Sequence, residues 1–133
     1  MYYLDTNTPI INFGKILNDD VYMDKSLLIE KINRKIGKRN CYVCITRPRC
    51  FGKTSNVSML DAYFTVGYDA RSLFKGLKIE NSETFKEHLN KHHVIYIDFS
   101  RMPDECHNYQ DYIQSIQRDS RKIWKMHILI RNS

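Results

Sequence analysis

The chain has 133 residues, of which 42% are hydrophobic and 27% charged, and these proportions fit an ordinary single globular domain. No apolar run approaches the ~20 residues that span a bilayer, and the first residues lack the basic region and long apolar core of a secretory signal. These absences predict a cytoplasmic protein. A net charge of +6 favours partners that carry phosphate, such as nucleotides or nucleic acids.

The first part of the chain predicts a lead-in followed by one amphipathic helix. Residues 1–14 are expected to be a lead-in with a turn at 6–9. A lead-in helix is expected over about residues 24–36, with Asp24 as a suitable cap and Gly37 as a suitable end. Four apolar residues recur there at the three- and four-residue spacing of a helix face: Leu28, Ile29, Ile32 and Ile36.

Apolar strands alternate with helices in the rest of the chain. Residues 41–46 are nearly all apolar, as in a strand covered on both faces, and a second strand is expected over 93–99. Helices are expected over about 53–64 and 109–124, and a final short strand over 126–130. This alternation predicts an α/β fold with a parallel sheet. The side chains expected to face inward from the helix over 53–64 are Val57, Leu60 and Phe64.

The most informative motif lies between the first predicted strand and the helix that follows it. It reads Thr46-Arg47-Pro48-Arg49-Cys50-Phe51-Gly52-Lys53-Thr54. A strand, a loop with Gly-Lys-Thr and a helix are the layout of a phosphate-binding loop (P-loop), although the usual pattern has Gly where this chain has Arg47. The alternative is a positively charged turn whose lysine is simply solvated. The surrounding strand and helix favour the phosphate-binding interpretation.

Each residue of this loop has a chemical role in phosphate binding. Gly52 lets the backbone approach phosphate oxygens, Lys53 supplies charge to the β and γ phosphates, and Thr54 can ligate Mg²⁺ through its hydroxyl. The N–H groups at the start of the next helix add to the anion site. The predicted nucleotide-binding residues are Arg49, Cys50, Phe51, Gly52, Lys53, Thr54 and Ser55.

Three ordered segments resemble the AAA-ATPase-like family, bacterial proteins in which a P-loop ATPase-like domain usually precedes a PD-(D/E)XK nuclease-like domain. They are Tyr22 to Ile29, Thr46 to Leu60 and Leu73 to Ile79. The family typically carries Arg-Pro-Arg before its Phe-Gly-Lys-Thr, so the resemblance makes Arg47 a family trait. The resemblance implies ATP and Mg²⁺ as cofactors and a partial P-loop NTPase-like three-layer fold with a short parallel sheet. It further implies a single truncated domain over residues 1–133, with the Asp24–Lys25 segment near the nucleotide.

Hydrolysis of ATP also requires a second carboxylate that holds Mg²⁺ and orients water. The run from Val94 to Asp98 imitates such a strand, but its place better suits the second strand of the fold. Asp98 is therefore a weaker metal candidate than Thr54. By the resemblance, the family's carboxylate strand comes after the region where this chain ends. Hydrolysis is consequently expected to be weak or absent.

The cysteines and histidines give weaker signals. Cys41 and Cys44 form a C-x-x-C pair, but residues three apart in a strand point to opposite faces. His88 and His92 could share a helix face, yet a third metal ligand is missing from the pattern. Buried or half-buried reduced thiols are expected at all four cysteines, Cys41, Cys44, Cys50 and Cys106.

Basic residues gather in two short clusters that fit either solvated helix faces or a nucleic-acid footprint. The footprint would support an alternative function, a non-catalytic interaction protein carried by a phage or mobile element that binds and inhibits a nucleoprotein complex. A third alternative is a non-functional remnant with unpaired strand edges. Nucleotide binding is the leading prediction. The clusters are Lys31, Arg34, Lys35, Lys38 and Arg39, and Arg118, Arg121, Lys122 and Lys125.

Overall fold

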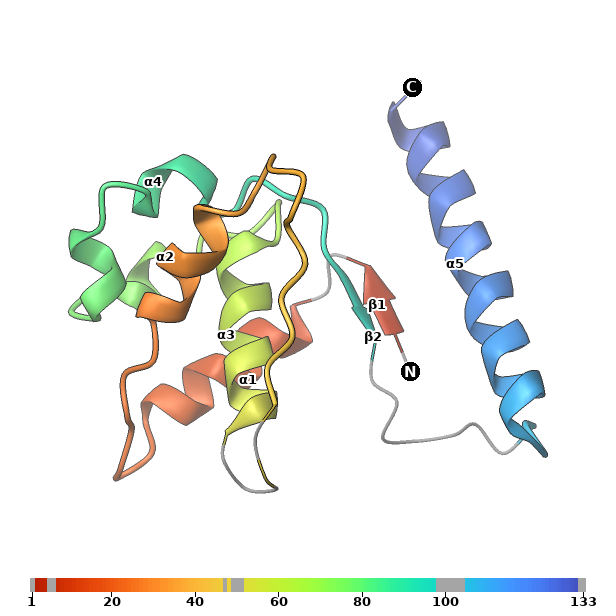
Figure 1. Ribbon diagram of the computed structural model, residues 1–133, viewed down its shortest axis with the longest axis horizontal. Coiled ribbons are helices and arrows are strands. Elements are labelled where there is room, and N and C mark those ends of the chain that lie inside the picture. The colour runs from red at the N-terminus through yellow and green to blue at the C-terminus, as the bar shows by residue number, and fades with distance from the viewer. Residues whose placement is uncertain (1, 5–6, 47, 49–51, 98–104, 132–133) are drawn as a thin grey trace. The chain divides into compact units, whose positions relative to one another are not determined.

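The chain forms two compact units (Figure 1). The computed structural model describes residues 2–4, 7–46, 48, 52–97 and 105–131. The larger unit consists of residues 5–94, and the smaller unit combines residues 1–4 with residues 95–133. The predicted phosphate-binding loop lies within the larger unit.

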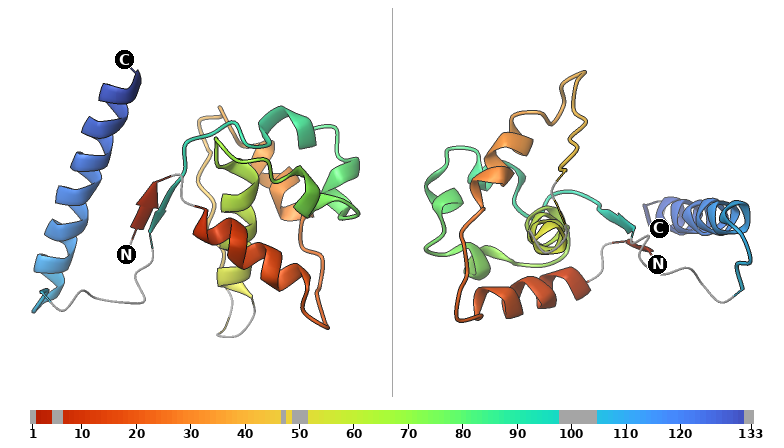
Figure 2. Two further views of the ribbon diagram at one scale, coloured as in Figure 1. Left: turned by 180° about the vertical axis from the view of Figure 1, so that it is seen from behind. Right: turned by 60° about the horizontal axis from the view of Figure 1, so that its bottom comes forward.

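The larger unit is built from helices. α3 lies at its centre and α1 packs across it, with α2 and α4 on other sides (Figure 2). Two short 3-10 helices, η1 and η2, lie between α3 and α4 in the chain. The bounds are α1 Thr8–Leu17, α2 Leu27–Asn33, α3 Lys53–Phe64, η1 Arg71–Phe74, η2 Lys78–Asn81 and α4 Phe85–His88.

Four aromatic rings form the centre of the core. The ring of Phe74 lies 5.3 Å from that of Phe13 on α1 and 5.7 Å from that of Tyr63 on α3, centre to centre. Phe85 on α4 lies 5.9 Å from Tyr63 and 6.2 Å from Phe74. Edge-to-face and tilted pairs at these distances stabilise a core beyond the area that they bury. The cluster therefore joins α1, α3, η1 and α4.

The predicted helix over 53–64 is confirmed as α3, but a different face of it is buried. Met59, Ala62 and Tyr63 are the buried apolar residues, whereas Val57 is 40% exposed, and Leu60 and Phe64 are half-buried. Both sets have the three- and four-residue spacing of a helix face. Spacing alone could not choose between them, because the choice depends on where α1 packs.

The lead-in helix predicted over about 24–36 is present but shorter. It is α2, Leu27–Asn33, with Ser26 at its N-cap position. Asp24 does not occupy that position, although its carboxylate accepts a hydrogen bond from the Ser26 N–H at 2.8 Å. Ile29 is buried, and Leu28 packs against the core. The predicted apolar face is thus the face that α2 turns inward.

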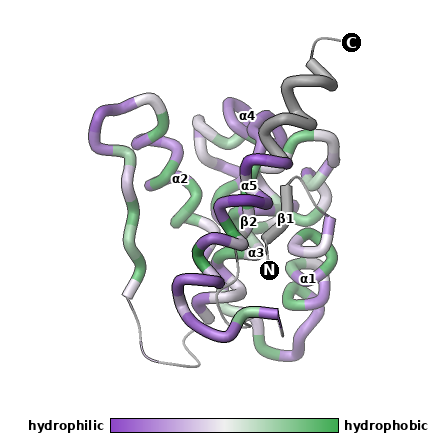
Figure 3. The backbone as a smooth tube through the Cα atoms, turned by 90° about the vertical axis from the view of Figure 1, so that its right-hand side faces the viewer, coloured by the Kyte–Doolittle hydropathy of each residue, from purple (hydrophilic) through white to green (hydrophobic). Residues whose placement is uncertain are grey.

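The prediction of a strand over 41–46 is wrong. The segment has no sheet partner among the described residues, and every one of its side chains is exposed, Tyr42 to 85%. Figure 3 shows it as a hydrophobic stretch of tube between the hydrophilic turn after α2 and the grey loop. A run of apolar residues becomes a strand only when a neighbouring strand supplies backbone hydrogen bonds. Within the described chain, the second predicted strand pairs elsewhere.

That second strand is β2, Ile95–Ile97, within the predicted range 93–99. It pairs antiparallel with β1, Tyr2–Leu4, so that Tyr3 lies opposite Tyr96. The only parallel pairing among the described residues is an isolated bridge between Thr65 and His92. The predicted short parallel sheet is therefore not found in the described part of the chain, and the N-terminal lead-in contributes the strand that pairs with β2.

The last helix is longer than predicted. α5 extends over Tyr109–Arg131 and includes residues 126–130, so the final short strand predicted there is wrong. Its apolar residues at 126 and 128–130 fit a helix as readily as a strand, because a short apolar run carries no decisive period. Among the helices of the described residues, none has the length and apolar character needed to cross a bilayer.

Candidate functional site

The start of α3 has the backbone geometry of an anion site. Gly52 is its N-cap residue, with φ of 75° in the left-handed region, and its carbonyl accepts from the Asn56 N–H at 2.9 Å. The first N–H groups of a helix have no partner within it, and Gly52 has no side chain with which to cap them. The N–H groups of the first turn, Lys53 to Ser55, therefore carry the positive end of the helix dipole.

Lys53, the first residue of α3, contacts Pro48. Its ammonium donates to the carbonyl oxygen of Pro48 at 3.0 Å. The side chains of Lys53 and Thr54 are exposed, and Ser55 is half-buried. The structure thus brings Gly52, Lys53, Thr54 and Ser55 together on the first turn of α3. The other predicted nucleotide-binding residues, Arg49, Cys50 and Phe51, lie outside the described residues, as does Arg47.

A second lysine lies beside this turn. A Cβ added at Gly52 would lie 3.2 Å from the Nζ atom of Lys25. Lys25 comes from the stretch between α1 and α2, 27 positions before Gly52 in the chain. Two ammonium groups, those of Lys25 and Lys53, are consequently placed around the N-terminus of one helix.

Hydrogen bonds on both sides of Lys25 fix its position. The Asp24 carboxylate accepts from the Lys78 N–H at 2.8 Å as well as from Ser26, and the buried Ser26 hydroxyl accepts from the Ile79 N–H at 3.1 Å. Partial burial raises the pKa of the Asp24 carboxyl, but the hydrogen bonds from Ser26 and Lys78 outweigh burial and the net pKa shift is downward. The segment 24–26 is therefore attached to η2.

An open groove of about 900 Å³ runs from the start of α3 along this segment. Its volume lies within the range of about 300–1,000 Å³ that is usual for small-molecule sites. Gly52, Ser55 and Asn56 line the end near α3, and Lys25 also lines it. The rest of the lining is mainly apolar and includes Phe13, Val21, Tyr22, Met23, Leu28 and Met59.

The predicted Mg²⁺ ligands are only partly placed. Thr54 is exposed on the first turn of α3, while Asp98 lies outside the described residues. No group of three or more His, Cys, Asp or Glu side chains suited to a metal ion occurs in the described part of the chain. The role of Thr54 as a Mg²⁺ ligand therefore remains a prediction.

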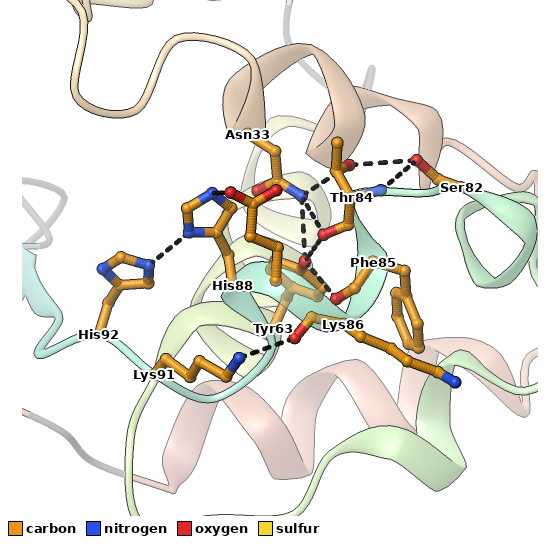
Figure 4. A network of polar contacts seen from close by, with 10 residues as sticks. Asn33, Tyr63, Ser82, Thr84, Phe85, Lys86, His88, Lys91 and His92 are labelled. Carbon is orange, nitrogen blue, oxygen red and sulfur yellow. Dashed lines mark hydrogen bonds and ion pairs between the residues drawn. The ribbon is translucent and has the colours of Figure 1, made fainter.

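The two histidines contact each other away from the start of α3 (Figure 4). His88 Nδ1 lies 3.0 Å from His92 Nε2, and His88 Nε2 lies 3.7 Å from Glu87 Oε1. Burial lowers the pKa of His92, and the neighbouring His88 and Lys91 lower it further. A shared helix face was the expectation, but His92 lies beyond the end of α4. The pair joins α4 to the bridge at Thr65.

The cysteines do not form a joint site in the described residues. Cys41 and Cys44 are free and exposed, which corrects the expectation of buried or half-buried thiols. Among the described residues, no strand pairs with the segment that carries them. Cys106 is free and half-buried, as expected, and Cys50 lies outside the described residues.

Comparison with protein families identifies the chain. The family model of predicted AAA-ATPases matches residues 8–131. The chain belongs to this predicted AAA-ATPase family. Comparisons with curated proteins and with solved structures each found no significant match. Membership of the family indicates a nucleotide-binding role, and the matched range includes both the start of α3 and the groove.

For this AAA-ATPase-like chain, the sequence did not predict the groove. Its lining residues are spread from position 13 to position 59, and no local pattern joins them. The resemblance placed the Asp24–Lys25 segment near the nucleotide without giving Lys25 a role. The signal for Lys25 is the place of its ammonium beside Gly52, which only the folded chain shows.

Proposed function

We propose that this chain binds ATP together with Mg²⁺ through the loop 46–54 and the first turn of α3, and that it hydrolyses ATP weakly or not at all. The observation that carries the proposal is the start of α3 at a left-handed Gly52, followed by Lys53, Thr54 and Ser55, in a member of the predicted AAA-ATPase family. The Gly-Lys-Thr motif and the membership of the family both support phosphate binding at this position.

The donors present fit a polyphosphate. Backbone N–H groups of the first turn of α3 bind phosphate oxygens, and the helix dipole adds to the attraction. Lys53 exchanges its contact with the Pro48 carbonyl for one with the β and γ phosphates. Thr54 holds Mg²⁺ through its hydroxyl, and Mg²⁺ neutralises charge on the phosphates when bound. Arg49 adds a further positive charge, and Asp98 is the weaker candidate for a carboxylate near Mg²⁺.

Calorimetric titration of ATP with Mg²⁺ tests this function, with wild type compared against Lys53→Ala. Wild type is expected to bind at micromolar strength. Loss of a charge-assisted hydrogen bond costs about 1.5–3 kcal/mol, which is roughly a 10- to 150-fold rise in Kd. Lys86→Ala is the control, because Lys86 is an exposed lysine on α4 that does not line the groove. Absence of ATP binding by wild type, or equal binding by Lys53→Ala, refutes the proposal.

A second function is non-catalytic binding of a nucleoprotein complex, and the basic surface of α5 favours it. Arg118, Arg121 and Lys122 are exposed on successive turns of this helix, with Lys122 3.8 Å from Asp119. Exposed basic groups bind nucleic acid with a strong dependence on salt. Titration of fluorescent RNA and DNA against wild type and an Arg118→Ala, Arg121→Ala variant tests it. Equal, salt-independent binding by both proteins would remove this candidate.

A further inference from the structure

We infer that Lys25 is a second phosphate-binding cation, and that the apolar groove which it borders binds the base and ribose of the same nucleotide. The inference rests on the proposed nucleotide binding and extends it to the nucleoside end. Within the described chain, the groove and the start of α3 share Gly52, Ser55 and Asn56 as lining residues. A ligand with its phosphates on α3 therefore has the groove directly beside it.

Lys25 occupies the junction between the two parts of the site. Its Nζ atom lies against Gly52, where a Cβ would meet it at 3.2 Å, and the side chain also lines the groove. Lys53 is the first residue of the same helix, and its ammonium donates to the Pro48 carbonyl. Both lysines and the positive end of the α3 dipole attract an anion bound at the start of α3.

The position of Lys25 is set by the fold rather than by a flexible loop. Its two chain neighbours are held by η2, since Asp24 accepts from Lys78 and Ser26 accepts from Ile79. The Asp24 carboxylate accepts from the backbone N–H groups of Ser26 and Lys78. The backbone that carries Lys25 therefore needs little further ordering when an anion binds.

The groove offers a surface that suits an aromatic base. Tyr22 is half-buried and packs edge-on against Phe13 at 6.5 Å, which provides an aromatic wall. Val21 and Met23 are 90% and 73% exposed on either side of Tyr22. Exposed apolar side chains at the rim of a groove mark a site where a flat apolar group gains by displacing water. The occupant is thus the aromatic base of a nucleoside triphosphate, and its triphosphate is the part that reaches α3.

Titrations with ATP and with inorganic tripolyphosphate separate the two ends of the site. Wild type is expected to bind ATP at least tenfold more tightly than tripolyphosphate, because tripolyphosphate leaves the groove empty. Lys25→Met keeps the apolar stem and removes the charge, so it should lower the affinities for ATP and for tripolyphosphate at least tenfold. Lys25→Arg keeps the charge and should retain most of the wild-type affinity for both ligands. Lys86→Met is the matched control.

A substitution at the rim of the groove gives an independent test. Met23→Ser alters an exposed side chain, so the fold should be retained. It is expected to lower the affinity for ATP about threefold or more and to leave the affinity for tripolyphosphate unchanged. Equal affinity of wild type for ATP and tripolyphosphate overturns the inference, as does unchanged binding by Lys25→Met. If ATP binding depends on Lys53 but not on Lys25 or Met23, the proposed function stands and this inference fails. If wild type binds neither ligand, both fail.

Discussion

Replacement of Tyr63 by Phe removes one buried hydroxyl and leaves the ring in place. That hydroxyl donates to the Phe85 carbonyl at 2.7 Å and accepts from Asn33 Nδ2 at 3.0 Å, as Figure 4 shows. Tyr63 is fully buried, so water cannot replace either partner. Asn33 Nδ2 keeps a contact with Thr84 Oγ1 at 3.2 Å, whereas the Phe85 carbonyl loses its donor from α3. A buried group left without its partner costs about 1–3 kcal/mol, and we expect a loss of about 1–2 kcal/mol.

The unfolding temperature converts this loss into a measurable shift. The larger unit has about 90 residues, which gives an unfolding entropy of about 0.2 kcal/mol/K. Tyr63→Phe should therefore unfold about 5–10 °C below wild type when followed by circular dichroism at 222 nm. Tyr42→Phe is the matched control, because Tyr42 is 85% exposed and should change stability by less than about 0.5 kcal/mol. Equal unfolding temperatures for the two variants would refute the assignment of this network to the stability of the fold.

Three further predictions concern pH, backbone strain and packing. Burial lowers the pKa of His92 below its ordinary 6.5, so its contribution to stability is present above pH 6.5 and is lost as the pH falls. Between pH 8 and pH 5, the free energy of unfolding in urea should therefore decrease less for His92→Gln than for wild type. Gly52→Ala and Gly37→Ala place Ala at φ near +75°, and each should lower the free energy of unfolding by about 1–2 kcal/mol. Only Gly52→Ala should also lower the affinity for ATP, because only its Cβ meets a lysine. Equal ATP affinity of the two glycine variants would contradict this. Phe74→Ala should cost about 3–5 kcal/mol in urea unfolding because Phe74 is fully buried among other rings, and a loss below about 1 kcal/mol would contradict that packing.

Local sequence signals predicted the helix that carries the site. α3 has the predicted bounds because Gly52 can adopt a left-handed φ and the residues after it contain no helix breaker until Gly67. The grouping of Gly52, Lys53 and Thr54 on one turn follows directly from that start. Their roles toward phosphate and Mg²⁺ remain predictions.

Features that depend on distant partners were predicted poorly. The run 41–46 has the composition of a buried strand, yet it lacks a strand partner in the described chain. The prediction failed because composition cannot specify which segment lies next to a strand. β2 was found by its apolar run, but its pairing with Tyr2–Leu4 required knowledge of the other end of the chain. The groove beside α3 was missed for the same reason, because it brings together residues from α1 to α3.

The attachment of segment 24–26 to η2 has a consequence for the order of folding. Asp24 and Lys78 are 54 positions apart in the chain, so their hydrogen bond closes a long loop and must compensate for the entropy of that closure. Helices such as α3 form from neighbouring residues and are favoured early, whereas contacts of high sequence separation form slowly. We therefore expect Lys25 to reach its place beside Gly52 only after η2 has formed. The first turn of α3 is a local product of the sequence, whereas the place of Lys25 beside it depends on the tertiary fold.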